Sequence, residues 1–243
     1  MKVGLFIPCY INALYPEVGE ASYKLLTQLG VEVDYPLDQT CCGQPAYSSG
    51  HPDEAREVAR AQLALFPEPW PIVVPSGSCA GMMKHHWPQL FEGDRDAGRA
   101  AAVAARVIEF SDFLVNVLHW QRPDQGAPAR VAVHTSCSAR REMGTHLTSW
   151  QLVDQLAHVT RVVHDHEPEC CGFGGVFSIK HPDISGAMAD DKTAALLTSG
   201  ATEFVTADAG CLMNLNGKLA HDHQRLPGKH LATFLLERSQ GRP

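Results

Sequence analysis

Short apolar runs alternate with amphipathic stretches along the first part of the chain. Two of the apolar runs are continuous and β-rich, as buried strands are, and a third is shorter. The runs that predict strands are Lys2–Ile7, Val31–Tyr35 and Pro71–Pro75. Between and after them lie stretches with apolar residues at helical spacing, two of which have a proline near the start. The stretches that predict helices are Pro16–Leu29, His51–Leu65 and Ala97–Leu118.

The same order returns in the second part. Strands are predicted at Arg130–His134, Val159–His164 and Glu203–Thr206, and helices at Leu147–Ala157 and Pro182–Thr198. Residues 121–128 are polar and rich in Pro and Gly, which marks a boundary. We therefore expect an α/β fold of two pseudo-symmetric three-layer halves, residues 1–122 and 129–243, each a mostly parallel sheet flanked by helices.

The cysteines follow this duplication. Each half has a single cysteine, then an adjacent Cys-Cys-Gly, then a second single cysteine, with none left over. The two sets are Cys9, Cys41, Cys42 and Cys79, and Cys137, Cys170, Cys171 and Cys211. The first spacings are 41 − 9 = 32 and 170 − 137 = 33, and the second are 79 − 42 = 37 and 211 − 171 = 40. The repeated spacings argue against eight unrelated cysteines.

Every cysteine follows a predicted strand. The single cysteines come directly after a strand, and each Cys-Cys-Gly comes about six residues after one. In a parallel sheet the carboxyl ends of the strands lie on one edge, where ligand sites form. We therefore expect the four cysteines of each half to converge there.

Composition restricts the classes of function. The 243 residues are 44% hydrophobic, enough for a large buried core, and the net charge of −7 argues against nonspecific nucleic-acid binding. No apolar run is long enough to span a membrane, and the first residues lack the features of a signal peptide. Eight cysteines without an export signal favour reduced thiols in the cytoplasm, where metal or redox chemistry is commoner than structural disulfides.

Adjacent cysteines favour an iron–sulfur cluster over a single zinc ion. Structural zinc sites usually take pairs separated by two to four residues, whereas two neighbouring thiolates have little freedom to occupy two corners of one tetrahedron. Binding two irons of one cluster is easier for them. Zinc, a disulfide framework, unrelated buried thiols and a redox-active vicinal disulfide remain alternatives.

Other residues near the cysteines are candidates for cofactor binding. Gly43, Gly172 and Gly174 allow close backbone approach and positive φ, so their loops can direct N–H groups at cluster sulfurs. Gln44 and Asn214 are candidate hydrogen-bond donors around the sites. In the second half, a histidine can approach the cysteines and bond a sulfur, although structural packing is the commoner role for such a residue. The three histidines in question are His134, His164 and His166.

These motifs resemble those of a known family. Residues 41–46 (Cys-Cys-Gly-Gln-Pro-Ala), 76–79 (Ser-Gly-Ser-Cys), 170–175 (Cys-Cys-Gly-Phe-Gly-Gly) and 211–214 (Cys-Leu-Met-Asn) are similar to the cysteine-rich CCG domain. That domain occurs twice in one of the subunits of heterodisulfide reductase, and also in the iron–sulfur subunits of glycolate oxidase and anaerobic glycerol-3-phosphate dehydrogenase. The closest resemblance, over the whole chain, is to the lactate utilization protein A family. The reductase motif ends in Cys-x-x-Cys, whereas Met82 and Asn214 stand at the final position here.

The resemblance implies an iron–sulfur electron-transfer subunit of a multi-component system that oxidises L-lactate to pyruvate. It implies one cluster of the [4Fe–4S] type per repeat, held by the four cysteines, and partner subunits that include a ferredoxin-type iron–sulfur protein. Whether this chain is itself an enzyme stays open. The alternatives are a disulfide- or quinone-linked oxidoreductase of the heterodisulfide reductase type and a zinc-bound scaffold without redox activity.

Overall fold

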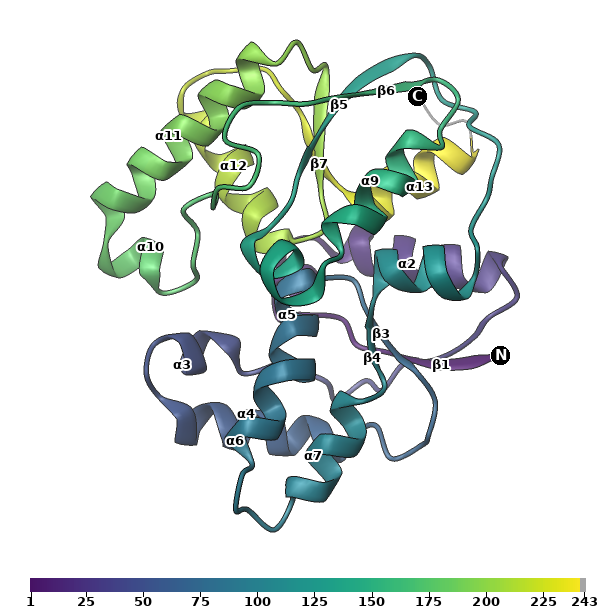
Figure 1. The fold of residues 1–243 in the computed structure, drawn as a ribbon, viewed down its shortest axis with the longest axis vertical. Coiled ribbons are helices and arrows are strands. Elements are labelled where there is room, and N and C mark those ends of the chain that lie inside the picture. The colour runs from purple at the N-terminus through teal and green to yellow at the C-terminus, as the bar shows by residue number, and fades with distance from the viewer. Residues whose placement is uncertain (241–243) are drawn as a thin grey trace.

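The computed structural model describes residues 1–240, which form two four-stranded parallel sheets with helices around them (Figure 1). The first sheet has the order β2-β1-β3-β4, and the second has the corresponding order β6-β5-β7-β8. The strands of the first sheet are β1 (Lys2–Leu5), β2 (Glu32–Asp34), β3 (Ile72–Val74) and β4 (Val107–Glu109). Those of the second are β5 (Ala129–His134), β6 (Val159–Val162), β7 (Glu203–Thr206) and β8 (Gly228–His230). The expected α/β architecture of two similar halves is confirmed.

The helices also correspond between the halves. The first half contains α1 (Cys9–Leu14), α2 (Pro16–Gln28), α3 (Gln44–Ser48), α4 (Pro52–Leu63), α5 (Gly77–Gly81), the π-helix η1 (Met82–His86), α6 (Trp87–Leu90), α7 (Ala97–Ala104), α8 (Phe110–Asp112) and the π-helix η2 (Phe113–Val117). The second contains the π-helix η3 (Ala139–Met143), α9 (His146–Asp154), α10 (Phe177–Lys180), α11 (Pro182–Thr198), α12 (Ala209–His221) and α13 (Leu231–Gln240). By chain order, α2 matches α9, α4 matches α11, and the α8–η2 segment matches α13.

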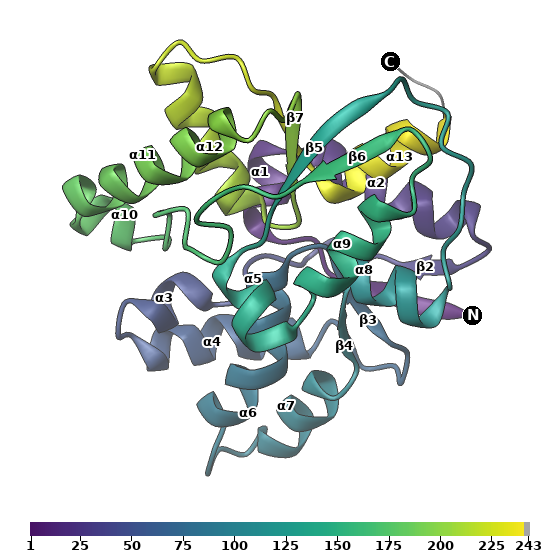
Figure 2. The ribbon, with the colours of Figure 1, turned by 45° about the horizontal axis from the view of Figure 1, so that its top comes forward.

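One layer of helices is shared by the two sheets. Side chains alternate between the faces of a strand, and one face of each sheet contributes Val3, Leu5, Val131 and Val133 to a single core that continues into α2, α9 and α13. These helices lie between the sheets in Figures 1 and 2, where α2 packs against α13 and α9 packs against α8 and η2. The opposite faces have separate cores, which the outer helices of each half cover. Each sheet is therefore flanked by helices on both faces, with the middle layer in common.

The predicted helix over Ala97–Leu118 is wrong. Strand β4 interrupts it, pairing in parallel with β3 at the edge of the first sheet. The apolar residues that fit a helical stripe are divided among α7, β4 and the α8–η2 segment, and all of them are buried except Val117, which is 36% exposed. Strand β8 was not predicted, because Gly-Lys-His has neither an apolar run nor an alternating pattern. The second half as predicted extends to residue 243, and residues 241–243 lie outside the described residues.

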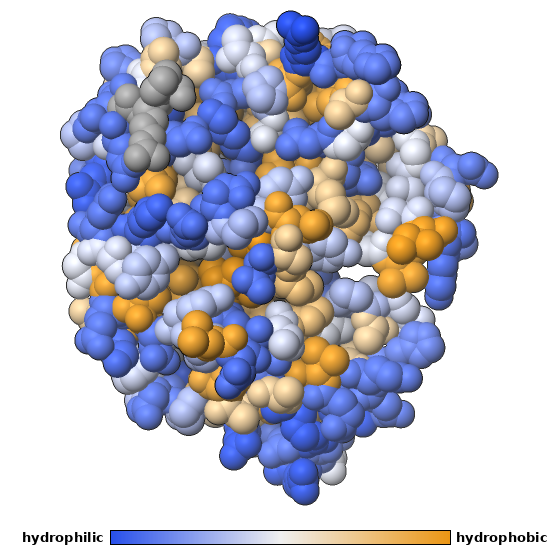
Figure 3. Space-filling model, turned by 180° about the vertical axis from the view of Figure 1, so that it is seen from behind, coloured by the Kyte–Doolittle hydropathy of each residue, from blue (hydrophilic) through white to orange (hydrophobic). Residues whose placement is uncertain are grey.

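The surface reflects this layering. Seen from behind, apolar side chains gather in a band across the middle of the molecule, whereas hydrophilic side chains predominate at both ends (Figure 3). Within residues 1–240, no helix is long and apolar enough to cross a membrane.

Candidate metal or cluster centre

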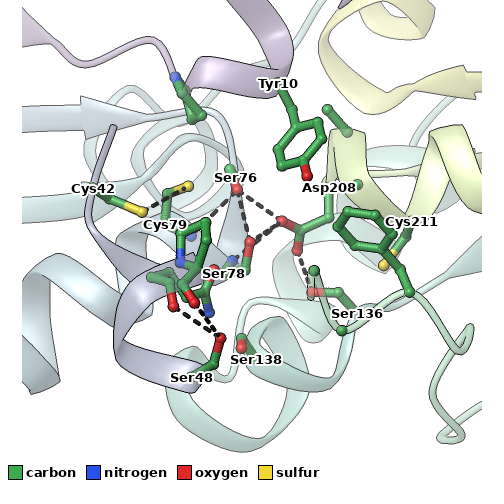
Figure 4. A pocket seen from close by; sticks show the side chains of 18 of the residues that line it. Tyr10, Cys42, Ser48, Ser76, Ser78, Cys79, Ser136, Ser138, Asp208 and Cys211 are labelled. Carbon is green, nitrogen blue, oxygen red and sulfur yellow. Dashed lines mark hydrogen bonds between the residues drawn. The ribbon is translucent and has the colours of Figure 1, made fainter. Parts of the chain in front are cut away.

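All eight cysteines line one cavity of about 160 Å³ between the carboxyl edges of the two sheets. Each of the four single cysteines lies in the segment just after β1, β3, β5 or β7, and the two Cys-Cys-Gly segments follow β2 and β6. Figure 4 shows Cys42 and Cys79 on one side of the cavity and Cys211 on the other. The cysteines, far apart in the sequence, therefore meet at the strand ends, as the parallel sheets predicted.

The first set forms two close pairs of thiols. The Sγ atoms of Cys42 and Cys79 lie 3.3 Å apart, and those of Cys9 and Cys41 lie 3.7 Å apart. These separations are well beyond the S–S bond length of about 2.05 Å, and all eight cysteines are free thiols. Hydrogen bonds from the thiols of Cys42 and Cys9, with a further one from the Gly43 N–H, lower the pKa of Cys41 well below its ordinary value. A thiolate is the form of cysteine that binds metals.

The Cys-Cys-Gly turn of each half requires its glycine. Gly43 and Gly172 have φ of +88° and +87°, and the N–H of each donates to the first cysteine of its pair at 3.4 Å. A Cβ at Gly172 would lie 2.5 Å from the carbonyl oxygen of Ser185. Gly174 lines the cavity with φ +50°, and Gln44 lines it as the first residue of α3. The two glycines thus direct backbone donors at sulfur, and α4 and α11 leave no room for a side chain there.

Each turn is fixed by a side chain that donates to the carbonyl of its second cysteine. In the second half, Asn214 Nδ2 donates to the Cys171 carbonyl at 2.8 Å. In the first half, Trp87 Nε1 donates to the Cys42 carbonyl at 2.9 Å. Asn214 is therefore a donor, as expected, although it reaches the backbone of the turn rather than a sulfur. Trp87 was missed because it lies eight residues after Cys79, whereas Asn214 lies three after Cys211.

A buried carboxylate joins the two halves at the floor of the cavity. Asp208 accepts hydrogen bonds from the hydroxyls of Ser76 at 2.7 Å and Ser78 at 2.6 Å, and from that of Ser136 (Figure 4). Asp208 and Ser76 occupy the same position of the repeat, three residues before Cys211 and Cys79. The sequence therefore held a signal that we did not use: the change from Ser to Asp at matched positions.

The three candidate histidines differ in burial and in their contacts. His134 and His164 are buried, whereas His166 is exposed and bonds Glu169 at 2.8 Å. His134 lies beside the second set of cysteines, because a ring nitrogen and the Sγ atoms of Cys171 and Cys211 lie within 4.8 Å of one another. A grouping of nitrogen and sulfur donors in one buried place fits a metal ion or an iron–sulfur cluster.

Comparison with known proteins agrees with this geometry. A family model described as "Cysteine-rich domain" (CCG) matches twice, at residues 3–84 and 131–216. A lactate utilization protein A from an Exiguobacterium species is 41% identical over 241 residues, which cover 97% of each chain. The protein of the same name from Geobacillus thermodenitrificans is 38% identical over 240 residues, covering 98% of this chain and all of that one.

A solved structure shares the fold. The crystal structure of a hypothetical protein from Helicobacter pylori superposes with a TM-score of 0.68 at 11% identity. The match covers 98% of this chain and 49% of that one, so the chain spans about half the length of that structure. On the sequence matches and the paired cysteine motifs, the chain belongs to the lactate utilization protein A family of cysteine-rich CCG-domain proteins.

Proposed function

We propose that this chain is the iron–sulfur electron-transfer subunit of a multi-component system that oxidises L-lactate to pyruvate. The observation that carries the proposal is the meeting of two sets of four free thiols at one cavity. The name shared by its relatives supports a role in lactate utilization. One cluster of the [4Fe–4S] type would be held by each set. The first set is Cys9, Cys41, Cys42 and Cys79, and the second is Cys137, Cys170, Cys171 and Cys211.

The cysteines would be the ligands of each cluster, and the groups around them would set its reduction potential. A bound cluster would take up and release single electrons. The N–H groups of Gly43 and Gly172 donate to thiol sulfur, and such bonds stabilise the negative charge that reduction adds. The second cysteine of each pair, Cys42 or Cys171, is buried, whereas the first, Cys41 or Cys170, is half-buried. Each set thus has a sheltered side and a side that opens toward solvent.

The open side supports exchange of electrons with other proteins. We infer that the partners are the other subunits of the lactate utilization system, among them a ferredoxin-type iron–sulfur protein, and that the chain works in the cytoplasm. Cys9, Cys41, Cys137 and Cys170 are all partly exposed on the cavity side. Clusters near a protein surface can pass electrons to a docked partner without conformational change.

The deciding experiment is an analysis of the protein purified without oxygen. We expect iron and acid-labile sulfide in equal amounts, and an electron paramagnetic resonance signal after reduction. Adding L-lactate with the partner subunits should then produce the reduced signal. Protein that holds neither iron nor sulfide would overturn the proposal, and zinc alone would favour the scaffold without redox activity.

A second candidate is a reductase that acts on a disulfide or a quinone. The observation in its favour is that both cysteine sets face the same cavity, so that a small oxidised molecule would meet both. Spectra of the reduced protein that change on adding a disulfide or a quinone, without partner subunits, would support this function. Unchanged spectra would leave electron transfer between proteins as the function.

A further inference from the structure

The second cysteine set has beside it a histidine whose ring is otherwise unsatisfied. His134 ends β5 and is 1% exposed, and neither Nδ1 nor Nε2 has a hydrogen-bond partner within residues 1–240. A buried polar group without a hydrogen-bond partner destabilises the folded protein. Two such nitrogens on one buried ring lower the stability of the fold, which points to a partner that binds the ring.

The side chains placed to bind one metal ion together with His134 are two cysteines. A His134 ring nitrogen, Cys171 Sγ and Cys211 Sγ all lie within 4.8 Å of one another. Imidazole nitrogen and thiolate sulfur are the usual ligands of zinc, and both occur as ligands of the same cluster in some iron–sulfur proteins. His134 comes from the strand just before Cys137, so three segments of the second half bring donors to one point.

The first half shows that the fold does not need this histidine. The equivalent residue is Phe6, because 9 − 6 = 3 and 137 − 134 = 3. Phe6 is 0% exposed and packs in the outer core of its half with Cys42 and Cys79. A ring of similar width thus fills the same place with no polar atom. Packing alone does not explain a histidine at this position of the second half.

We propose that His134 is a nitrogen ligand of the metal centre held by Cys137, Cys170, Cys171 and Cys211. The second site then has five protein ligands, whereas the first has four. This inference rests on the proposed function only in that the cysteines hold a metal centre. It makes the two sites chemically different despite their common motif.

The test uses the full chain with Cys42→Ala, which removes the first site and leaves the second to be observed alone. The protein is produced with ¹⁵N-labelled histidine, purified without oxygen and reduced. Pulsed electron paramagnetic resonance should detect a strongly coupled ¹⁵N nucleus. The coupling should disappear in His134→Phe, the residue of the first half, and remain in the matched control His164→Phe.

The outcomes separate this inference from the proposed function. A cluster signal without a strongly coupled histidine nitrogen, or a coupling that survives His134→Phe, would overturn the inference and leave the proposed function standing. Should His134→Phe not fold, the labelled parent chain and His164→Phe still test the inference: a parent without a strongly coupled ¹⁵N nucleus overturns it, and so does loss of the coupling in His164→Phe. Zinc in place of iron would overturn the proposed function, and an all-sulfur zinc shell in X-ray absorption would then overturn the inference too.

Discussion

The two halves share a fold and a cysteine motif, but differ in the side chains placed behind the cysteines. Phe6 in the first half matches His134 in the second. Gln62 matches Lys192, since each lies ten residues after the proline that starts α4 or α11. Gln62 bonds Thr40 at both ends of its amide, and Lys192 donates to the carbonyls of His166 and Glu167. The motif that would bind the cofactor is thus preserved, whereas the surrounding charge has diverged.

A third pair of equivalent residues differs in acid–base character between the two halves. Glu109 and His230 are the last residues of β4 and β8, paired with Val74 and Thr206 at matched registers. Both are buried, and both cap the helix that follows: Glu109 accepts from the Ser111 N–H, and His230 Nδ1 accepts from the Ala232 N–H. An acid and a base therefore do the same structural work in the two halves.

The largest effect should come from removing one buried cysteine of either set. We expect Cys42→Ala and Cys171→Ala each to lower bound iron and sulfide to about half, because each removes a ligand from one of two separate sites. Ser48→Ala, also in the cavity wall, is the matched control and should leave iron unchanged. Loss of all iron in either cysteine variant would mean that the two sets form one shared centre.

The next largest effect is on the pH dependence of stability. The equivalent residues Glu109 and His230 should change the free energy of unfolding in opposite directions as the pH rises. Burial raises the pKa of Glu109 from 4.5 to about 8 and lowers that of His230 from 6.5 to about 4. Between pH 4.5 and 8 the folded state keeps the Glu109 proton that the unfolded state has lost, so its contribution falls as pH rises. Between pH 4 and 6.5 the unfolded state binds a proton at His230 that the folded state does not, so its contribution rises with pH.

Comparison with variants isolates each group. Relative to Glu109→Gln, the free energy of unfolding of the parent apo-protein should fall by about 4 kcal/mol across the upper window. Relative to His230→Gln, it should rise by about 3 kcal/mol across the lower window. Urea unfolding at a series of pH values measures both. Two differences with the same sign would contradict the assignment.

A smaller effect is expected from exchanging the residues behind the two sites. The charge of Lys192, which is 1% exposed, acts on Cys170 and Cys171 and should stabilise a reduced centre there. Lys192→Gln should therefore lower the reduction potential of the second site by some tens of millivolts, an order of magnitude set by one charge in a partly shielded interior. Lys180→Gln, an exposed charge on α10, should have little effect. An unchanged reduction potential in Lys192→Gln would show that the charge of Lys192 does not make the second site differ from the first.

The smallest effect concerns the side chains that fix the Cys-Cys-Gly turns. Trp87→Phe keeps most of the packing but removes the bond to the Cys42 carbonyl, and Asn214→Ala removes the bond to the Cys171 carbonyl. Each should destabilise the apo-protein by about 1–2 kcal/mol, as measured by urea unfolding. A cost near zero for Trp87→Phe would show that the first turn is fixed by packing alone.

The apolar runs along the chain were enough to predict most of the strands and the convergence of the cysteines. The apolar runs before Cys9, Cys79, Cys137 and Cys211 are buried strands, and strand ends in a parallel sheet must share an edge. Two edge strands were not predictable in the same way. Residues 107–109 continue a helical pattern, and residues 228–230 have almost no apolar character, so both depend on the neighbouring strand for their conformation.

Features that depend on docking of the halves were beyond the sequence alone. The apolar face of α2 fits many partners, and nothing local specifies α13. The change from Ser76 to Asp208 at matched positions is visible in the sequence, but the hydrogen bonds of Asp208 to serines of both halves form only when the halves dock. His134 was one of three histidines that the sequence allowed near the second site, but that its ring has no hydrogen-bond partner within residues 1–240 is visible only in three dimensions.

The shared middle layer has a consequence for the origin of the chain. The pairing of α2 with α13 is the reciprocal of the pairing of α9 with the α8–η2 segment, as in the self-complementary interface of a twofold homodimer. A single ancestral copy would have left its half of that layer exposed and so would have associated with a second copy. Fusion through residues 121–128 would make this association intramolecular, so that the cavity assembles at any protein concentration. Fusion also frees the two copies of each residue to change independently, as Phe6 and His134 have.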